Sequence, residues 1–122
     1  AGTKRSKPNM GIRTSYSENS ADFASSIIVS TNPIVLLGFT VYNSGPAQFI
    51  QLFDDTAVPA NGEAPILPVP VEADSVFGMY WGEEGRYFPN GLVLCNSSTD
   101  STKTLGSADC WFDVQVRVPA EK

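Results

Sequence analysis

Side chains that commonly do chemistry are few in this chain, and its 122 residues include no histidine. Histidine is the commonest general base and metal ligand, so its absence excludes Ser-His-Asp and Cys-His catalysis and a blue-copper site with two histidine ligands. The remaining candidates are two adjacent carboxylate pairs, Asp54 with Asp55 and Glu83 with Glu84, together with two cysteines.

The carboxylate pairs offer acid–base chemistry or a Ca²⁺ site. Glycosidase carboxylates lie roughly 5–9.5 Å apart across a sugar, whereas adjacent residues on a strand point to opposite faces. Both pairs stand beside expected turns, and a Ca²⁺ site would need several more converging oxygens. We therefore expect that the protein is not an enzyme and that it binds neither a metal ion nor a cofactor.

The two cysteines, Cys95 and Cys110, each stand at the inner end of an expected strand. If these strands pair as a hairpin, the thiols lie near each other, and a disulfide would contribute about 3 kcal/mol. Two reduced, buried cysteines are the alternative, which cytoplasmic synthesis favours. The absence of a CxxC pair and of histidine argues against a zinc site.

An aromatic stretch flanks the acidic turn at residues 83–85. Tyr80 and Trp81 precede the turn, and Tyr87 follows it. These side chains would suit a sugar-binding platform or the centre of a protein interface. Packing into the core is the alternative for the same residues.

Charge is divided between the N-terminus and the rest of the chain. The first thirteen residues hold no acid and four basic residues, whereas the remainder has four basic and thirteen acidic residues; the four N-terminal ones are Lys4, Arg5, Lys7 and Arg13. This asymmetry predicts an arm that binds an acidic partner, with a solvated tail as the alternative. Nucleic acid is disfavoured, because phosphate would repel the acidic body.

Strands must position these residues. Residues 1–24 show neither a period of 2 nor one of 3.6, and we expect an extended basic arm there, followed by one domain at residues 25–122. Short apolar runs between turn clusters predict strands at residues 26–30, 34–43, 48–54, 65–73, 75–82, 86–88, 91–96 and 110–118. The turn Asn43-Ser44-Gly45-Pro46 predicts a hairpin between the second and third of these strands.

Two of the expected strands carry a clear pattern. Within residues 65–73, Pro68 and Pro70 share one parity, so both missing N–H donors fall on one side, as suits an edge strand. Apolar residues of the other parity are expected to face the core: Leu67, Val69 and Val71. Residues 110–118 alternate between two faces, and the inward set is predicted to be Phe112, Val114, Val116 and Val118.

These patterns predict an all-β fold, either an antiparallel β-sandwich or a jelly-roll-like barrel with an extended N-terminal arm. The longest apolar run, residues 33–39, is far shorter than the roughly 20 residues that span a bilayer, so we expect no membrane partner. The N-terminal basic residues are followed by no apolar segment, and Ala1 permits removal of a preceding Met, so we expect synthesis in a cytoplasm.

Several short sequence motifs within residues 39–116 resemble those of small virion-associated proteins of tailed bacteriophages. The first is Tyr42-Asn43-Ser44-Gly45, and the stretch at residues 48–54 reads QFIQLFD. Further on come Val58-Pro59-Ala60-Asn61-Gly62, Phe88-Pro89-Asn90-Gly91-Leu92-Val93, and a loop with Asn96-Ser97-Ser98-Thr99 and Thr102-Lys103-Thr104. The resemblance does not cover the N-terminal arm.

The resemblance implies a structural role, namely that of a head decoration or cement protein on the capsid surface, with the major capsid protein as its partner. Lys4, Arg5, Lys7 and Arg13 would then pair with capsid carboxylates, and we expect a homo-oligomer, with a trimer as the working assumption. The alternatives are a carbohydrate- or receptor-binding module on the virion, using Tyr80, Trp81 and Tyr87, and a head–tail or tail component.

Overall fold

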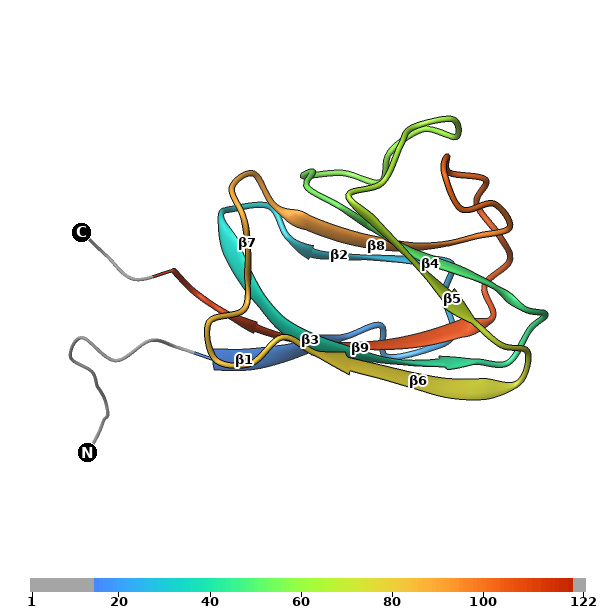
Figure 1. The fold of residues 1–122 in the computed structure, drawn as a ribbon, viewed down its shortest axis with the longest axis horizontal. Coiled ribbons are helices and arrows are strands. Elements are labelled where there is room, and N and C mark those ends of the chain that lie inside the picture. The colour runs from blue at the N-terminus through green and yellow to red at the C-terminus, as the bar shows by residue number, and fades with distance from the viewer. Residues whose placement is uncertain (1–14, 120–122) are drawn as a thin grey trace.

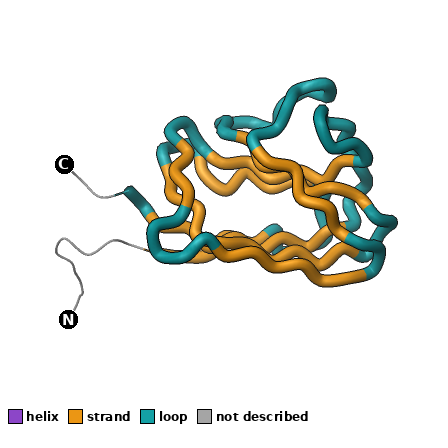
Figure 2. The backbone as a smooth tube through the Cα atoms, in the orientation of Figure 1, coloured by secondary structure: helices purple, strands orange, loops and turns teal. Residues whose placement is uncertain are grey.

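Residues 15–119 are described by the computed structural model, and they form nine strands in two sheets (Figure 1). The five-stranded sheet contains β1 (Ser15–Asn19), β3 (Ile34–Asn43), β6 (Ser75–Tyr80), β7 (Arg86–Phe88) and β9 (Cys110–Arg117). The four-stranded sheet contains β2 (Ser26–Ser30), β4 (Gln48–Phe53), β5 (Leu67–Val71) and β8 (Leu92–Ser97). The two sheets lie face to face, so the predicted antiparallel β-sandwich is confirmed (Figure 2).

Every strand pairing is antiparallel. The five-stranded sheet has the order β1-β9-β3-β6, and β7 pairs with the part of β3 that β6 leaves unpaired. The four-stranded sheet has the order β2-β8-β4-β5. The core lies between the sheets, where alternate side chains of β3 and β9 meet those of β4 and β8.

The predicted alternation of β9 is confirmed at three of its four inward positions. Phe112, Val114 and Val116 are fully buried between the sheets. Val118 lies beyond the end of β9 and is exposed, so its predicted inward orientation is wrong. The strand ends at Arg117, where β1 and β3 also provide their last partners.

The predicted edge strand is also confirmed. β5 ends the four-stranded sheet, with Pro68 opposite Gln51 and Pro70 opposite Phe49. Both prolines are exposed, whereas Val69 and Val71 are buried in the core. A proline offers no N–H donor, so the open side of β5 is a poor template for another strand.

The predicted hairpin between residues 34–43 and 48–54 is wrong. β3 lies in the five-stranded sheet and β4 in the four-stranded sheet, so the turn between them carries the chain from one layer to the other. Asn43 fixes this corner, because its Nδ2 donates to the carbonyl oxygens of Pro46 (2.8 Å) and Glu72 (2.9 Å). β8 and β9 likewise lie in different sheets and form no hairpin.

The arm predicted at residues 1–24 extends too far along the chain, because its last residues belong to the sandwich. Residues 15–19 form β1, which pairs along its full length with β9, and Ala24 forms a bridge with Cys110. All five β1 residues are exposed, so backbone pairing rather than burial holds the strand, and its side chains carry no apolar period. Residues 1–14 lie outside the described residues, and an arm there stays a prediction.

The outer faces of the two sheets differ. Loops cover the outer face of the four-stranded sheet over β8, and all six residues of β8 are buried. Outward residues towards the edges of this sheet, Ile28 on β2 and the two prolines of β5, stay exposed. The Gln51 side chain donates to the carbonyl oxygens of Thr99 (2.8 Å), Asp100 (3.1 Å) and Thr102 (3.0 Å), which ties one loop down. A backbone bond of 2.8 Å from Lys103 N–H to the Glu63 carbonyl joins this loop to its neighbour.

Candidate interaction surface

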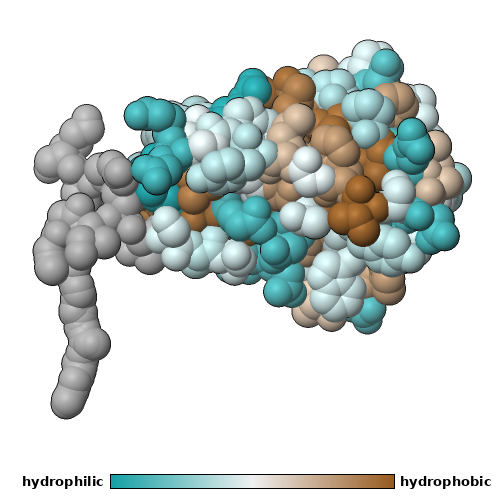
Figure 3. All heavy atoms as spheres, turned by 60° about the horizontal axis from the view of Figure 1, so that its bottom comes forward, coloured by the Kyte–Doolittle hydropathy of each residue, from teal (hydrophilic) through white to brown (hydrophobic). Residues whose placement is uncertain are grey.

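The outer face of the five-stranded sheet, here called the open face, is exposed. Figure 3 brings it towards the viewer and shows hydrophobic side chains between polar ones. Paired residues of an antiparallel sheet point to the same side, so the register defines three rows across this face. They are Gln115-Gly38-Tyr80, Asp113-Thr40-Gly78 and Trp111-Tyr42-Val76.

An aromatic cluster occupies the end of the open face that lies far from Ser15. Phe23 meets the rings of Tyr42 and Trp111 edge to face, at centroid distances of 5.9 and 5.8 Å. All three side chains are partly exposed, and the neighbouring Val76 is 66 % exposed. Edge-to-face rings at this distance attract each other and form a rigid apolar patch.

The Tyr42 hydroxyl donates a hydrogen bond of 3.1 Å to the Asp74 carboxylate. This bond, together with the negative charge of Asp74, raises the pKa of Tyr42. A neutral phenol with one occupied donor keeps lone pairs available as acceptors. The cluster therefore combines apolar rings with a polar rim.

Sequence reasoning missed this aromatic cluster. Trp111 shares the outward parity of Asp113 and Gln115 on β9, and Tyr42 shares that of Thr40 on β3. The alternation was therefore sufficient to place each ring on the outer side of its own strand. Their proximity depended on the β3–β9 register, which the sequence does not reveal.

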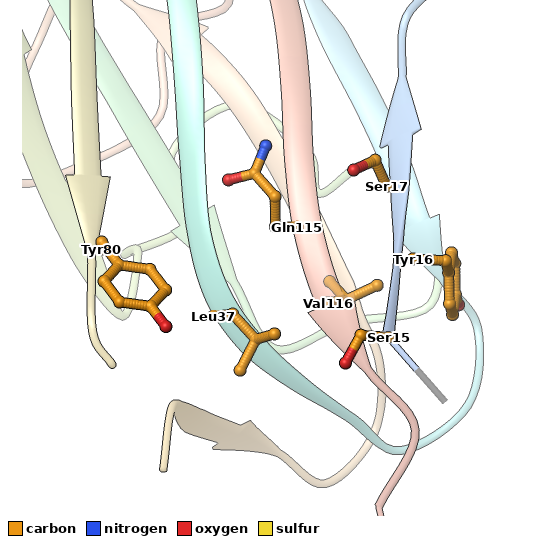
Figure 4. Close-up of a pocket in the computed structure, with 7 residues that line it drawn as sticks. All are labelled: Ser15, Tyr16, Ser17, Leu37, Tyr80, Gln115 and Val116. Atoms are coloured by element: carbon orange, nitrogen blue, oxygen red, sulfur yellow. The ribbon is translucent and has the colours of Figure 1, made fainter. Parts of the chain in front are cut away.

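A shallow groove of about 340 Å³ lies at the other end of the open face, beside β1 (Figure 4). Its lining residues come from four strands: Ser15, Tyr16, Ser17, Leu37, Tyr80, Gln115 and Val116. The β3–β9 register shifts between Leu36 and Gly38, which is the signature of a bulge and re-aims the intervening Leu37. A Cβ on Gly38 would lie 2.5 Å from the Met79 carbonyl oxygen and 3.2 Å from the Tyr80 ring, so glycine lets the backbone of β6 and this ring lie close against β3.

The three predicted aromatic site residues do not form one platform. Tyr80 and Tyr87 are 68 % and 56 % exposed, as a ligand or interface role requires. Trp81 instead packs against the core, with its ring centroid 6.1 Å from that of Phe39. Core packing therefore applies to Trp81, and only Tyr80 lines the groove.

The four predicted arm residues, Lys4, Arg5, Lys7 and Arg13, lie outside the described residues. The chain that carries them joins the sandwich at Ser15, on the edge strand beside the groove. Described basic residues are few, and one of them, Lys103, is 3 % exposed with its Nζ donating to Asn61 Oδ1 at 2.8 Å. The surface of the described sandwich is therefore strongly acidic.

Both acidic pairs make structural contacts, the first through a carboxylate and the second through backbone carbonyls. Asp54 accepts hydrogen bonds from the backbone N–H groups of Asn90 (2.9 Å) and Gly91 (3.3 Å), which ties β4 to the turn before β8. The carbonyl oxygens of Glu83 and Glu84 accept bonds from the Arg117 guanidinium at 3.2 and 3.3 Å. Among residues 15–119, no group of three or more Cys, Asp or Glu side chains is placed to hold a metal ion.

Both cysteines are free and buried, so the disulfide alternative is wrong for this structure. They lie on different strands of different sheets, and their side chains join different apolar clusters. Cys110 faces the core, whereas Cys95 packs with Phe53 and Val93 beneath the loops of the four-stranded sheet. Burial raises the pKa of Cys95 to about 11 and that of Cys110 to about 12.

A buried polar network surrounds the Cys110 thiol. The amide groups of Gln48 and Asn96 both donate to Asp109 Oδ1, at 3.0 and 3.1 Å. Asn43 Oδ1 accepts from Gln48 Nε2 at 2.8 Å and so joins the network to the corner between the sheets. These contacts fix the end of the sandwich and do not activate the thiol, because the thiolate is disfavoured there.

The fold and surface together define a β-sandwich in which loops cover the middle of one outer face and leave the other face open. No protein-family model matches the chain, and neither a curated protein nor a solved structure matches it at a significant level. No helix within residues 15–119 is long and apolar enough to cross a membrane.

Proposed function

We propose that this chain is a non-enzymatic structural protein of a tailed-phage particle that binds the outer capsid surface and stabilises the head. The observation that carries the proposal is the division of charge. A basic N-terminal segment is joined at Ser15 to an acidic sandwich, beside the open face. The segment and the face offer two separate contact regions on one chain, and such bivalency raises the effective concentration of the second contact.

The thiols support a structural rather than a nucleophilic role. A cysteine acts as a nucleophile through its thiolate, and burial raises the pKa of both cysteines well above neutral pH. The carboxylate pairs are occupied by backbone contacts or stand in exposed turns. The major capsid protein, with carboxylates on its surface, is the partner that the basic segment would suit.

Charge reversal tests the role of the segment. A variant with Lys4→Glu, Arg5→Glu, Lys7→Glu and Arg13→Glu is expected to lose binding to purified capsids that lack this protein. The matched control exchanges Lys for Arg and Arg for Lys at the same four positions, which keeps the charge and should keep most of the binding. Normal decoration of capsids by the charge-reversed variant would show that the segment is not the capsid contact.

Imaging of purified particles tests the location. Hundreds of copies on the capsid lattice, seen by cryo-electron microscopy and counted by quantitative mass spectrometry, are expected for a decoration protein. A few copies at a vertex would instead indicate a head–tail or tail component. Absence from particles would overturn the proposal.

A carbohydrate- or receptor-binding module is a second candidate, and the aromatic cluster on the open face favours it. Sugars stack on exposed aromatic rings, and Phe23, Tyr42 and Trp111 present three of them. Glycan-array binding by the isolated protein, lost in Trp111→Ala, would support this candidate. The same loss in Trp81→Ala would carry no weight unless that variant is shown to fold, because Trp81 packs against the core.

A further inference from the structure

The edge of the five-stranded sheet at β1 fits a second copy of this chain. We propose that two copies pair β1 with β1 in antiparallel fashion about a twofold axis at Ser17, so that their sheets join into one. This inference does not depend on the capsid role, and a dimer would take the place of the trimer expected from the resemblance.

β1 ends the five-stranded sheet, and no other strand within residues 15–119 pairs with its open side. The Ser20 N–H donates to the Phe112 carbonyl at 3.0 Å, continuing the β1–β9 ladder. Backbone groups alternate sides along an antiparallel strand, so Tyr16 and Glu18 also point to β9. The N–H and C=O groups of Ser15, Ser17 and Asn19 therefore point away from the sheet, and all three residues are exposed.

A twofold axis at Ser17 satisfies all of these groups. Ser17 would lie opposite Ser17 of the second copy, and Ser15 opposite Asn19, as three hydrogen-bonded pairs. Their small side chains lie on the open face, where they would not clash. Tyr16 would lie opposite Glu18, so no two like charges would face each other across the new ladder.

Charge favours β1 over β6, which is the other edge of this sheet. The Trp81 N–H donates to the Leu37 carbonyl at 2.7 Å, so alternate groups of β6, centred on Gly78, also point outward. A twofold axis at Gly78 would bring the turn with Glu72 and Asp74 of one copy beside Glu83 and Glu84 of the other. Like charges across such a contact cost binding energy.

The edge at β1 brings no such repulsion. Its one charged residue, Glu18, would face Tyr16 of the second copy rather than another carboxylate. The edges of the other sheet are less suitable, because prolines block β5 and the register of β2 shifts between Ile28 and Ser30.

Sedimentation tests whether the pairing occurs. We expect the full chain to show a concentration-dependent equilibrium between its 13.1 kDa monomer and a species of twice that mass. Ser17→Pro removes an N–H that the β1–β9 ladder does not use, and it should weaken the dimer by at least about tenfold, since two hydrogen bonds at the axis are lost. Ser17→Val keeps the N–H and is the matched control. A monomer at every concentration, or equal effects of the two variants, would overturn the proposal.

Cross-linking tests the register without weakening the strand. Cα atoms of a hydrogen-bonded antiparallel pair lie about 5.5 Å apart, which a disulfide can span. Ser17→Cys alone should therefore form a covalent dimer with oxidised glutathione, while the buried Cys95 and Cys110 stay reduced. Ser15→Cys and Asn19→Cys should each stay monomeric but cross-link when mixed. Equal cross-linking by all three single variants would indicate random collision and overturn the register.

Discussion

β8 and β9 lie in facing sheets and have opposite exposure patterns. β8 is buried at all six positions, whereas β9 alternates between buried and more exposed residues. The inner sides of both strands meet in the same core, so the difference arises on their outer sides. Loops cover the outer side of β8, whereas the outward residues of β9 stay partly exposed, with Phe23 packed against Trp111.

This difference separates a structural face from an interaction face. The outer face of the four-stranded sheet encloses a second apolar cluster, a buried Gln51 and a nearly buried Lys103. The open face instead carries exposed aromatic rings, the groove and the free edge at β1. Exposed apolar side chains grouped on one face are typical of a binding surface, so partners are expected at the open face.

Introducing a charged side chain should give the largest difference in stability between the two outer faces. Val93→Asp places a carboxylate at a fully buried position under the loops, and an unpaired buried charge should reduce the free energy of unfolding by about 3–5 kcal/mol. Val76→Asp makes the same change on the open face and should alter it by less than about 0.5 kcal/mol. Urea denaturation of both variants measures the contrast, and similar losses would show that the open face is covered.

Replacing a glutamine on each of the two faces should give the next largest difference in stability. Gln51→Met keeps the side-chain volume but removes the donor to three loop carbonyls, and should cost about 1–3 kcal/mol. Gln115→Met on the open face loses only a bond to Asp113 and should cost less than about 0.5 kcal/mol. Limited proteolysis should also show faster cleavage at residues 98–102 in Gln51→Met alone. Unchanged cleavage there would mean that Gln51 does not hold the loop.

The sequence predicted the strands well because their signals are local. Pro68 and Pro70 identified β5 as an edge, and the alternation from Phe112 to Val116 identified the two sides of β9. Both signals depend on backbone chemistry or side-chain parity within one strand. Such signals are present before any tertiary contact forms.

The missed features depend on contacts between distant segments. The turn after Asn43 looks like a hairpin turn, yet a corner between two sheets uses the same residue types, and only the Glu72 contact distinguishes them. β1 was missed because an edge strand exposed on both sides has no apolar period. The aromatic cluster joins Phe23, Tyr42 and Trp111 from three separate segments, so no local sequence pattern predicts it.

The buried thiols should give the smallest effect on stability, and this effect depends on pH. Burial raises the pKa of Cys95 to about 11 and that of Cys110 to about 12 in the folded chain, whereas an exposed cysteine ionises near about 8.5. Above that value the unfolded chain releases protons that the folded chain retains, so the stability present below about pH 8 declines as pH rises towards the folded pKa values.

At about pH 9 this decline should stay below about 1 kcal/mol per thiol. Urea denaturation from about pH 7 to 10 measures it, and the decline should be shallower in Cys95→Ala and Cys110→Ala. Thr40→Cys provides the contrast, because a thiol on the open face should react with a thiol reagent in the native state while Cys95 and Cys110 stay protected. Fast native labelling of Cys95 would mean that the loops open readily, and the two faces would then differ less than their burial indicates.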